Sequence, residues 1–345
     1  MNPLVSILIP AYNAERWLTD TLRSVLEQAW ERTEIIVVDD GSRDHTLEVA
    51  RQFESARVKV VSQENQGAAA ARNKCFSLSQ GDYIQWLDAD DLLGRGKIAR
   101  QMELVTQGLS ARMLLSAEWG RFLYRSRRAE FVPTALWSDL SRVEWLTRKM
   151  EQNLHMQTAT WLVSRELTEA AGPWNTQLLG DDDGEYFCRV LLASEGIRFV
   201  PGARVYYRDA GVGSLSYIGR SERKMVAQWK SMEKHIAYLR SLEDSPRVRA
   251  ACLTYLQNWL PSFYPERADL VAKAQEMAGI LGGRLAPPRL GWKYAWIRAL
   301  CGWDLAKRAQ VMLPAIRWGA VRCWDRAMSA LENLRFANRS SCDVA

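Results

Sequence analysis

Several features that define common protein classes are missing from this sequence. Its six cysteines form no C-x-x-C pair and no close grouping with histidine, so neither a zinc site nor a disulfide framework is predicted and a reducing compartment is favoured. The three histidines, His45, His155 and His235, are far apart and form no motif. No uncharged apolar run reaches the length of about 18 residues that a membrane-spanning helix needs.

A targeting segment and a glycine-rich phosphate loop are also absent from the start of the chain. Met1 leads into an apolar segment with no basic region before it, so no signal peptide is predicted. We therefore expect a cytoplasmic protein, either soluble or held peripherally at the inner face of the membrane. The first apolar segment is followed by "IPAYNAE", where a dinucleotide-dependent oxidoreductase needs glycines, and that class is therefore disfavoured.

The sequence does contain an alternation of strand-like and helix-like segments. Short runs rich in β-branched residues predict strands within 4–10, 34–39, 58–63 and 83–87. Apolar stripes or alanine-rich stretches predict helices within 17–28, 45–53, 67–78 and 97–107. This alternation predicts an α/β fold in which helices flank a mostly parallel, Rossmann-like sheet.

Beyond residue 95 the pattern is less regular. Strand-like pieces are expected near 113–116 and 121–124, and "TATWLVSREL" is interpreted as a strand that runs into a helix. A helix is expected after "LLGDDDG", and "IRFVPGARVYYR" is interpreted as a pair of strands. From about Ser221 the pattern is helical, which places a domain boundary near residue 215.

Polar side chains follow three of the predicted strands, at the point where each strand ends. Tyr12 and Asn13 follow the first strand, Asp40 follows the second, and "DADD" (residues 88–91) follows the fourth. The carboxyl ends of parallel strands meet at one edge of a sheet, where ligands bind. Crowded carboxylates repel one another unless a cation lies among them, and Mg²⁺ and Mn²⁺ prefer such oxygen ligands. The alternative for "DADD" is a capped strand-to-helix turn.

The order of these motifs carries a resemblance to a known family. "VSILIPAYNAERWLTDTLRSVLEQ", "IIVVDDGSRDHT", "NQGAAAARN" and "YIQWLDADD" together resemble the family 2 glycosyltransferases, which have the A-type glycosyltransferase fold. The resemblance extends through "TATWLVSRE", "GPWN" and "DDDGEYFCRVL" to about Arg208. It implies an inverting hexosyltransferase with a nucleotide-sugar donor, UDP-linked, and a saccharide or lipid-linked acceptor in cell-envelope or surface polysaccharide or glycolipid synthesis.

The resemblance also implies roles for residues in the donor-binding half. Asp90 would ligate Mg²⁺ or Mn²⁺, and Asp88 would face the ribose or the metal shell. The other donor-binding residues that it implies are Pro10, Tyr12, Asn13 and Glu15 over the base and ribose, Asp40 at the base edge, and Arg72 at the phosphates. From the residues alone, the alternatives are an ordinary strand-ending turn for the loop after the first strand and a solvated helix arginine for Arg72.

A glycosyltransferase needs a base that takes the proton from the acceptor hydroxyl. Counting back from Arg189, which matches an arginine of the family, the resemblance places this base at Asp183, with Asp182 in the neighbouring acidic position. The chain has three aspartates followed by "GE", which departs from the commoner pattern, so the choice between Asp182 and Asp183 stays open. The alternative is an acidic helix N-terminus that the helix dipole favours.

The last part of the chain combines tryptophan with basic residues. Five tryptophans and seven arginines or lysines lie within residues 290–328, a composition that suits a membrane interface. Charges interrupt every window long enough to span a bilayer, so we expect association with the membrane surface. The alternative is a helical appendage that packs its tryptophans on the catalytic domain or on a second subunit. No nucleic-acid module is recognised, so nucleic-acid binding is not expected.

These observations predict a catalytic domain over residues 1–215 and a helical region over 216–345. Within the first, residues 1–95 would bind the nucleotide sugar and 96–215 the acceptor. The competing hypothesis is a catalytically inactive nucleotide-sugar-binding or scaffold protein with the same fold.

Overall fold

A computed structural model of the protein describes residues 2–209, 221–264, 266–288 and 295–342. The predicted boundary near residue 215 lies outside these ranges.

The first sheet has five strands in the order β3-β2-β1-β4-β8. Its strands are β1 (Val5–Ala11), β2 (Thr33–Asp39), β3 (Val58–Ser62), β4 (Tyr83–Trp86) and β8 (Val163–Ser164). The first four in sequence are parallel, and β8 pairs with β4 in the antiparallel direction. Because β1 and β2 are buried along almost their whole length, their continuous apolar runs are those of strands covered on both faces.

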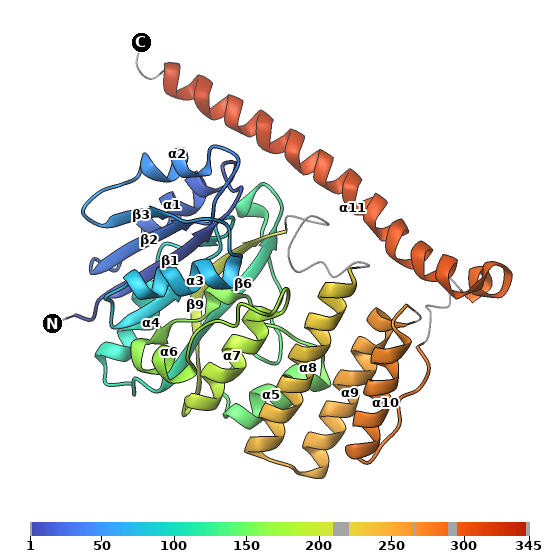
Figure 1. The fold of residues 1–345 in the computed structure, drawn as a ribbon. Helices are drawn as coiled ribbons and strands as arrows, with labels where there is room; N and C mark the ends of the chain where they lie inside the picture. The colour runs from blue at the N-terminus through green and yellow to red at the C-terminus, as the bar shows by residue number, and fades with distance from the viewer. Residues whose placement is uncertain (1, 210–220, 265, 289–294, 343–345) are drawn as a thin grey trace.

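Three helices connect these parallel strands. They are α1 (Leu18–Leu26), α2 (Thr46–Arg51) and α3 (Ala68–Leu78). Right-handed crossovers place α1 and α2 on one face of the sheet and α3 on the other, as Figure 1 shows. The α/β fold with a mostly parallel sheet is therefore confirmed.

The second sheet has the order β5-β9-β6-β7. Its strands are β5 (Leu92–Leu93), β6 (Met113–Phe122), β7 (Glu130–Phe131) and β9 (Gly196–Arg208). The two pieces expected at 113–116 and 121–124 form one strand, and the expected strand pair in "IRFVPGARVYYR" is wrong. Pro201 and Gly202 do not end a strand, because the β6–β9 register instead jumps from Ala117↔Val200 to Glu118↔Arg204 and absorbs them in a bulge.

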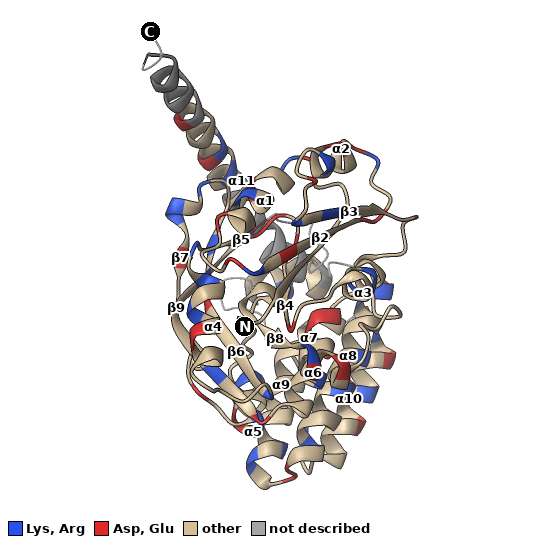
Figure 2. Cartoon of the chain, turned by 90° about the vertical axis from the view of Figure 1, so that its left-hand side faces the viewer, with Lys and Arg blue, Asp and Glu red and all other residues tan. Residues whose placement is uncertain are grey.

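The remaining helices pack beside the two sheets and continue beyond them. They are α4 (Lys97–Thr106), α5 (Arg142–Glu151), α6 (Arg165–Ala171), α7 (Asp182–Ala193), α8 (Glu222–Leu242), α9 (Pro246–Phe263), α10 (Ala268–Ile280) and α11 (Ala295–Cys342). Short 3-10 turns are η1 (Ser126–Arg128) and η2 (Thr158–Thr160). Helices α8 to α10 form a bundle beside α5 and α7, and α11 runs along the outside of the molecule (Figure 1, Figure 2).

A buried aromatic cluster fixes α7 against the end of β4. The rings of Trp174 and Tyr186 stack with centroids 4.0 Å apart, and Trp86 meets Tyr186 edge-on at 5.7 Å. All three side chains are buried, and such aromatic pairs stabilise beyond their buried area. The first turn of α7 is thereby held beside the carboxyl end of the first sheet.

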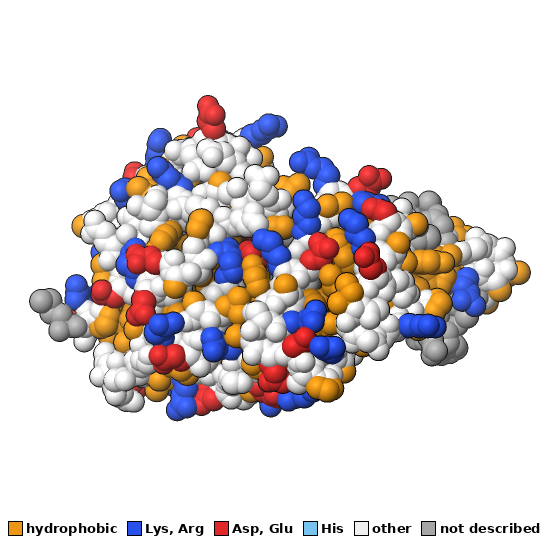
Figure 3. Space-filling view, turned by 60° about the horizontal axis from the view of Figure 1, so that its bottom comes forward, with side chains coloured by type: hydrophobic (Ala, Val, Ile, Leu, Met, Phe, Trp, Pro, Cys, Tyr) orange, Lys and Arg blue, Asp and Glu red, His pale blue; other side chains and the backbone are white. Residues whose placement is uncertain are grey.

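The face of the molecule seen from below in Figure 3 has an ordinary surface. Basic and acidic side chains alternate on its described part, with small apolar areas between them. Interspersed charge of both signs is typical of a solvated surface.

No helix among the described residues is long and apolar enough to cross a membrane.

Candidate active site

The turn after β4 presents two partly exposed carboxylates and one buried carboxylate. Asp88 and Asp90 are partly exposed, whereas Asp91 is fully buried. The backbone N–H of Asp91 donates to the carbonyl oxygen of Asp88 at 3.2 Å, which closes the turn. Successive side chains therefore point in different directions, and only the carboxylates of Asp88 and Asp90 are accessible to a ligand.

Asp91 anchors the turn to the second sheet. Its carboxylate accepts a hydrogen bond from the Gln157 side chain at 2.5 Å and another from the backbone N–H of Arg208 at 2.8 Å. The Arg208 guanidinium in turn donates to the carbonyl oxygen of Asp90 at 2.8 Å and lies 4.2 Å over the ring of Trp17. These contacts fix the backbone from which Asp88 and Asp90 project.

Arg72 joins the turn after β4 to the start of α7. Its guanidinium donates to Asp88 and to Asp182, each at 2.8 Å, and lies 4.4 Å over the ring of Trp174. The side chain is only 8% exposed. Burial lowers the pKa of Arg72, but Asp88 and Asp182 outweigh it and raise the pKa, so the side chain is a fixed cation. The predicted motifs "AARN", "DADD" and "DDD" thus meet at one place.

Asp182 and Asp183 differ in their partners. Asp182 forms the ion pair with Arg72, whereas Asp183 accepts a long hydrogen bond, 3.4 Å, from the Thr158 hydroxyl and another from the backbone N–H of Gly184. Both carboxylates are partly exposed. Of the two candidate bases, Asp183 is therefore the one without a salt bridge in the described structure.

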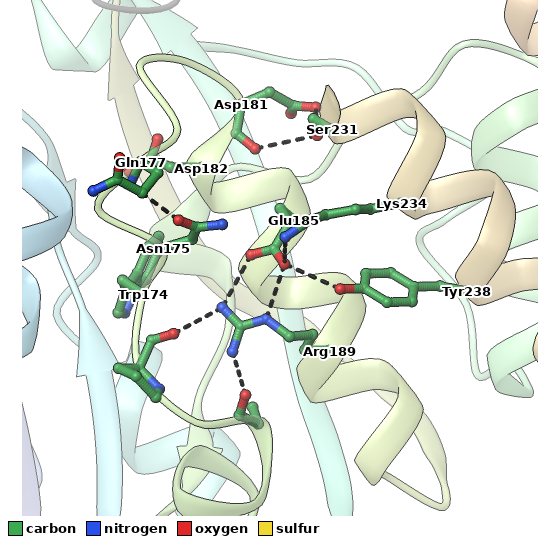
Figure 4. A network of polar contacts seen from close by, with 12 residues as sticks. Trp174, Asn175, Gln177, Asp181, Asp182, Glu185, Arg189, Ser231, Lys234 and Tyr238 are labelled. Carbon is green, nitrogen blue, oxygen red and sulfur yellow. Dashed lines mark hydrogen bonds and ion pairs between the residues drawn. The ribbon is translucent and has the colours of Figure 1, made fainter. Parts of the chain in front are cut away.

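The remaining aspartate of "DDD", Asp181, faces away from the carboxylates of Asp182 and Asp183. Its carboxylate accepts a hydrogen bond from the Ser231 hydroxyl of α8 at 2.5 Å and a longer one from Gln228. Figure 4 shows Asp181 turned toward Ser231, with Asp182 on the other side of the loop. A Cβ at Gly184 would lie 2.2 Å from the Asp181 carboxylate, so the glycine that follows the aspartates leaves the space that Asp181 fills.

Glu185 provides a second connection between α7 and α8. Its buried carboxylate accepts from Arg189 at 3.0 and 3.1 Å, from Lys234 at 3.1 Å and from Tyr238 at 3.1 Å (Figure 4). Burial raises the pKa of Glu185, but Arg189 and Lys234 outweigh it, and the pKa lies below its ordinary value. Glu185 is thus an ionised structural residue.

Crowding and burial make the carboxylates in the centre of the site unusually basic. Burial and the neighbouring Asp88 raise the pKa of Asp90 to about 6. Burial, opposed by Arg72 and aided by Asp183, raises the pKa of Asp182 to about 6. Burial and Asp181 raise the pKa of Asp183. We refer to Asp88, Asp90, Asp182 and Asp183 as the carboxylate cluster.

The loop after β1 is tied to the loop after β2. Pro10 is the second-last residue of β1, and Tyr12 is 47% exposed. Three hydrogen bonds join the loops: Asn13 N–H to the Ser42 hydroxyl at 3.0 Å, Arg43 N–H to the Asn13 side chain at 2.9 Å, and His45 N–H to the Glu15 carboxylate at 2.9 Å. The side chains of Asn13 and Glu15 are therefore engaged in hydrogen bonds between the two loops, while Tyr12 presents its ring to solvent.

Asp40 organises the loop that leads into α3. Its carboxylate accepts from the Gln63 side chain and from the backbone N–H groups of Gln66 and Gly67, at 2.8 to 2.9 Å. Gly41 has a φ of 69°, and a Cβ there would lie 2.8 Å from the Asn65 nitrogen, so only glycine fits this turn. The structure gives Asp40 this local role, and its contact with a base edge stays a prediction.

The carboxylate cluster fits a divalent cation that a ligand completes. No group of three or more His, Cys, Asp or Glu among the described residues is arranged as a full metal cage. Mg²⁺ and Mn²⁺ are commonly held by one or two carboxylates, with phosphate oxygens completing the shell. Asp90 carries no hydrogen bond or ion pair to its carboxylate from any other described residue, and burial and Asp88 raise its pKa, so a bound cation would favour its ionised form further.

Sequence reasoning missed the residues that hold the site in place. Gln157 and Arg208, which anchor Asp91, follow no recognisable pattern, and Arg208 only marked the end of the resemblance. Ser231, Lys234 and Tyr238 lie on α8, a helix to which no site role was assigned. The available signal was the departure at "DDDGE" from the family pattern, because an extra aspartate with a glycine after it indicates an additional local contact.

Comparison with known proteins places this site in a family. Residues 6–170 match the family model for glycosyl transferase family 2. This domain belongs to glycosyltransferase family 2. The family 2 match includes Arg72 and the turn after β4, whereas the aspartates at 181–183 lie beyond it.

Curated relatives align with part of this chain. The proposed teichuronic acid biosynthesis glycosyltransferase TuaG of Bacillus subtilis (strain 168) is 43% identical over 108 residues, which cover 30% of this chain and 43% of TuaG. The UDP-Glc:alpha-D-GlcNAc-diphosphoundecaprenol beta-1,3-glucosyltransferase WfgD of Escherichia coli is 37% identical over 103 residues, which cover 30% of this chain and 41% of WfgD. The matched segment thus spans less than half the length of these two relatives.

Solved structures resemble most of the chain. TarS of S. aureus (residues 1–349), solved with UDP-GlcNAc, gives a TM-score of 0.59 at 16% identity and covers 89% of this chain and 91% of that chain. The mannosyltransferase PcManGT of Pyrobaculum calidifontis, solved with GDP-Man and Mn²⁺, gives a TM-score of 0.52 at 17% identity and covers 94% and 88%. These likenesses confirm the predicted A-type glycosyltransferase fold.

Proposed function

We propose that this chain transfers a sugar from a nucleotide-sugar donor to a hydroxyl acceptor, with inversion at the anomeric carbon. The observation that carries the proposal is the bridge that Arg72 forms between Asp88 and Asp182. It joins the turn that would receive the donor diphosphate to the helix that carries the candidate base. Membership of glycosyltransferase family 2 supports the same reaction class.

In this proposal Asp183 is the base. Its raised pKa suits proton transfer near neutral pH, and no salt bridge from a described residue holds it in the ionised form. Asp183 takes the proton of the acceptor hydroxyl while that oxygen bonds to the anomeric carbon and the bond to the diphosphate breaks. Asp182 stays paired with Arg72 and positions the first turn of α7 beside the turn after β4.

Asp90, with Asp88 beside it, would hold Mg²⁺ or Mn²⁺. Such a cation, when bound, neutralises charge that develops on the departing diphosphate. The solved relative PcManGT contains Mn²⁺ with its nucleotide sugar, which supports this choice. Pro10, Tyr12, Asn13, Glu15 and Asp40 are proposed to line the nucleoside part of the donor site.

We infer a UDP-linked donor and an acceptor in cell-envelope polysaccharide or glycolipid synthesis. TarS was solved with UDP-GlcNAc, and the name of WfgD specifies a UDP-sugar donor and a diphosphoundecaprenol-linked acceptor. A cytoplasmic location and the absence of nucleic-acid binding stay predictions.

A panel of UDP-sugars tests this function directly. The purified full chain is incubated with each donor and Mn²⁺, and released UDP is measured with and without saccharide acceptors. The proposal expects turnover of at least one donor and its loss in Asp183→Asn. Binding of UDP with Mn²⁺ but no turnover of any donor would favour the scaffold hypothesis instead.

A further inference from the structure

Helix α11 attaches to the catalytic fold through its polar residues. Asp325 is buried and accepts from the backbone N–H of Tyr124 at 3.0 Å and from the Arg125 guanidinium at 2.6 Å. Glu332 pairs with Arg125 at 3.1 Å. The spacing of seven residues between Asp325 and Glu332 puts both on one side of the helix, and this side faces the protein.

A further ion pair, at a second attachment site, holds the same side of the helix. Arg322 donates to Asp209 at 2.9 Å. Asp209 directly follows Arg208, the residue that donates to the Asp90 carbonyl oxygen. The helix is therefore mounted beside the strand end that supports the carboxylate cluster.

Exposed apolar side chains lie on α11 within residues 318–332, the longest part of the helix whose side chains the structure describes without a gap. Trp324 is 68% exposed, Leu331 is 51% exposed and Val321 is 42% exposed. We use the name outer arc for six exposed, uncharged residues on this side of the helix: Ala320, Val321, Cys323, Trp324, Ala327 and Leu331. A surface helix normally buries its apolar stripe and exposes its polar face. Within residues 318–332 the helix instead turns Arg322, Asp325 and Glu332 toward the protein and exposes apolar side chains, so something outside the described structure is expected to cover the outer arc.

The charge of the helix indicates what covers it. Residues 295–342 contain eight arginines and lysines but only three acidic residues, and two of these acids, Asp325 and Glu332, are paired with arginines of the catalytic fold. The remaining charge is positive and complements an anionic surface. A second copy docked through the same helix would bring like charges together, which opposes association.

We propose that the outer arc of α11 docks on an anionic lipid bilayer. Tryptophan is enriched at the depth of the lipid headgroups, and a basic amphipathic helix gains both apolar burial and electrostatic attraction when it lies in that plane. The two attachment sites orient the helix so that its apolar side meets the lipid while its acidic residues stay on the protein. The proposal goes beyond glycosyl transfer, because docking needs neither donor nor acceptor.

Vesicle sedimentation tests this docking. The full chain is mixed with vesicles of phosphatidylglycerol and phosphatidylcholine, and separately with phosphatidylcholine alone. We expect binding to the anionic vesicles, weakening as salt is raised because screening reduces the attraction. Trp324→Glu should weaken binding by about tenfold or more, since it places a charge in the buried apolar face. The matched control is Ile280→Glu on α10, where the native side chain is 62% exposed, and it should bind as the native chain does.

Sedimentation velocity of the same proteins tests the alternative that a second copy of the chain covers the outer arc. The proposal is overturned if the native chain does not bind anionic vesicles. It is also overturned if the native chain is a dimer that Trp324→Glu dissociates and neither protein binds vesicles. Circular dichroism confirms that both variants are folded. Loss of UDP release with vesicle binding intact would count against the proposed transfer reaction and leave the docking unaffected.

Discussion

The two aspartate clusters of the site follow the same rule but are anchored differently. In "DADD" the buried Asp91 is held by Gln157 and Arg208, and in "DDD" the partly exposed Asp181 is held by Ser231 and Gln228. Each of these two aspartates fixes the backbone from which its neighbours project. The comparison teaches that a run of acidic residues contains both structural and chemical members, and the hydrogen-bond partners of each carboxylate tell them apart.

The difference lies in where the anchors come from. Gln157 and Arg208 belong to the first 208 residues, whereas Ser231 and Gln228 lie on α8. The "DADD" aspartates are therefore supported from within the α/β fold, whereas the "DDD" aspartates depend on the helical region that follows. Changes on α8 are expected to affect the base without affecting donor binding.

The largest effect is expected from Asp183→Asn. Loss of the base should lower kcat by about 10²- to 10⁴-fold, while UDP affinity stays close to that of the native chain. Initial rates of UDP release with a saccharide acceptor provide the measurement. Asp139→Asn, at a half-exposed carboxylate away from the cluster, is the control, and native-like turnover in Asp183→Asn would move the base elsewhere.

Asp90→Asn should separate the metal side from the base side. The variant keeps the size of the side chain but loses the charge that would hold the cation, so its turnover should respond little to added Mn²⁺. Rates are compared over a Mn²⁺ titration after removal of metal with a chelator. If the variant retains the native Mn²⁺ response, Asp90 is not a ligand.

Ser231→Ala tests the dependence of the base on α8. Removing the hydroxyl takes away a 2.5 Å hydrogen bond to Asp181, and a small displacement of the base should cost about tenfold or more in kcat. The pH profile of kcat should shift as well, because Asp181 contributes to the raised pKa of Asp183. Ser241→Ala on the same helix, whose exposed hydroxyl bonds only the Tyr238 carbonyl oxygen among the described residues, should leave both unchanged.

The smallest effect concerns stability against pH. Asp90 and Asp182 have pKa values raised to about 6, so between about pH 4 and 6 the folded chain binds protons more tightly than the unfolded chain. The metal-free protein should therefore lose stability as pH rises through this window. Mn²⁺ should raise Tm more at about pH 7.5 than at about pH 5, and an equal shift at both would argue against binding at the cluster.

Much of the fold could be predicted from the sequence. The apolar runs of β1, β2 and β4 stand out because both faces of these strands are buried, and their ends bring Asp40 and Asp88 to one edge of the sheet. The break expected at Pro201 was wrong because a parallel neighbour, β6, continues past it and a bulge absorbs the extra residues. Sequence alone does not show when such a neighbour exists.

Less of the site could be predicted. Asp88 and Asp90 were found because like charges at a strand end are costly, and Asp182 and Asp183 were found through the family resemblance. The partners Gln157, Ser231 and Arg208 are single polar residues with no repeating pattern. Arg72 was expected near phosphates, and the structure pairs it with Asp88 and Asp182. The direction of the apolar arc on α11 also could not be read from the sequence, because a helical stripe does not reveal which side meets the protein.

The central claim is that Asp88 and Asp90 hold a divalent cation against a nucleotide diphosphate. Calorimetric titration of UDP into the metal-free full chain, with Mn²⁺ and with a chelator, tests it most directly. We predict that Mn²⁺ tightens UDP binding by about tenfold or more, which corresponds to about 1.4 kcal/mol, in the native chain and in Asp183→Asn alike. Equal UDP affinity with and without Mn²⁺ would contradict the claim.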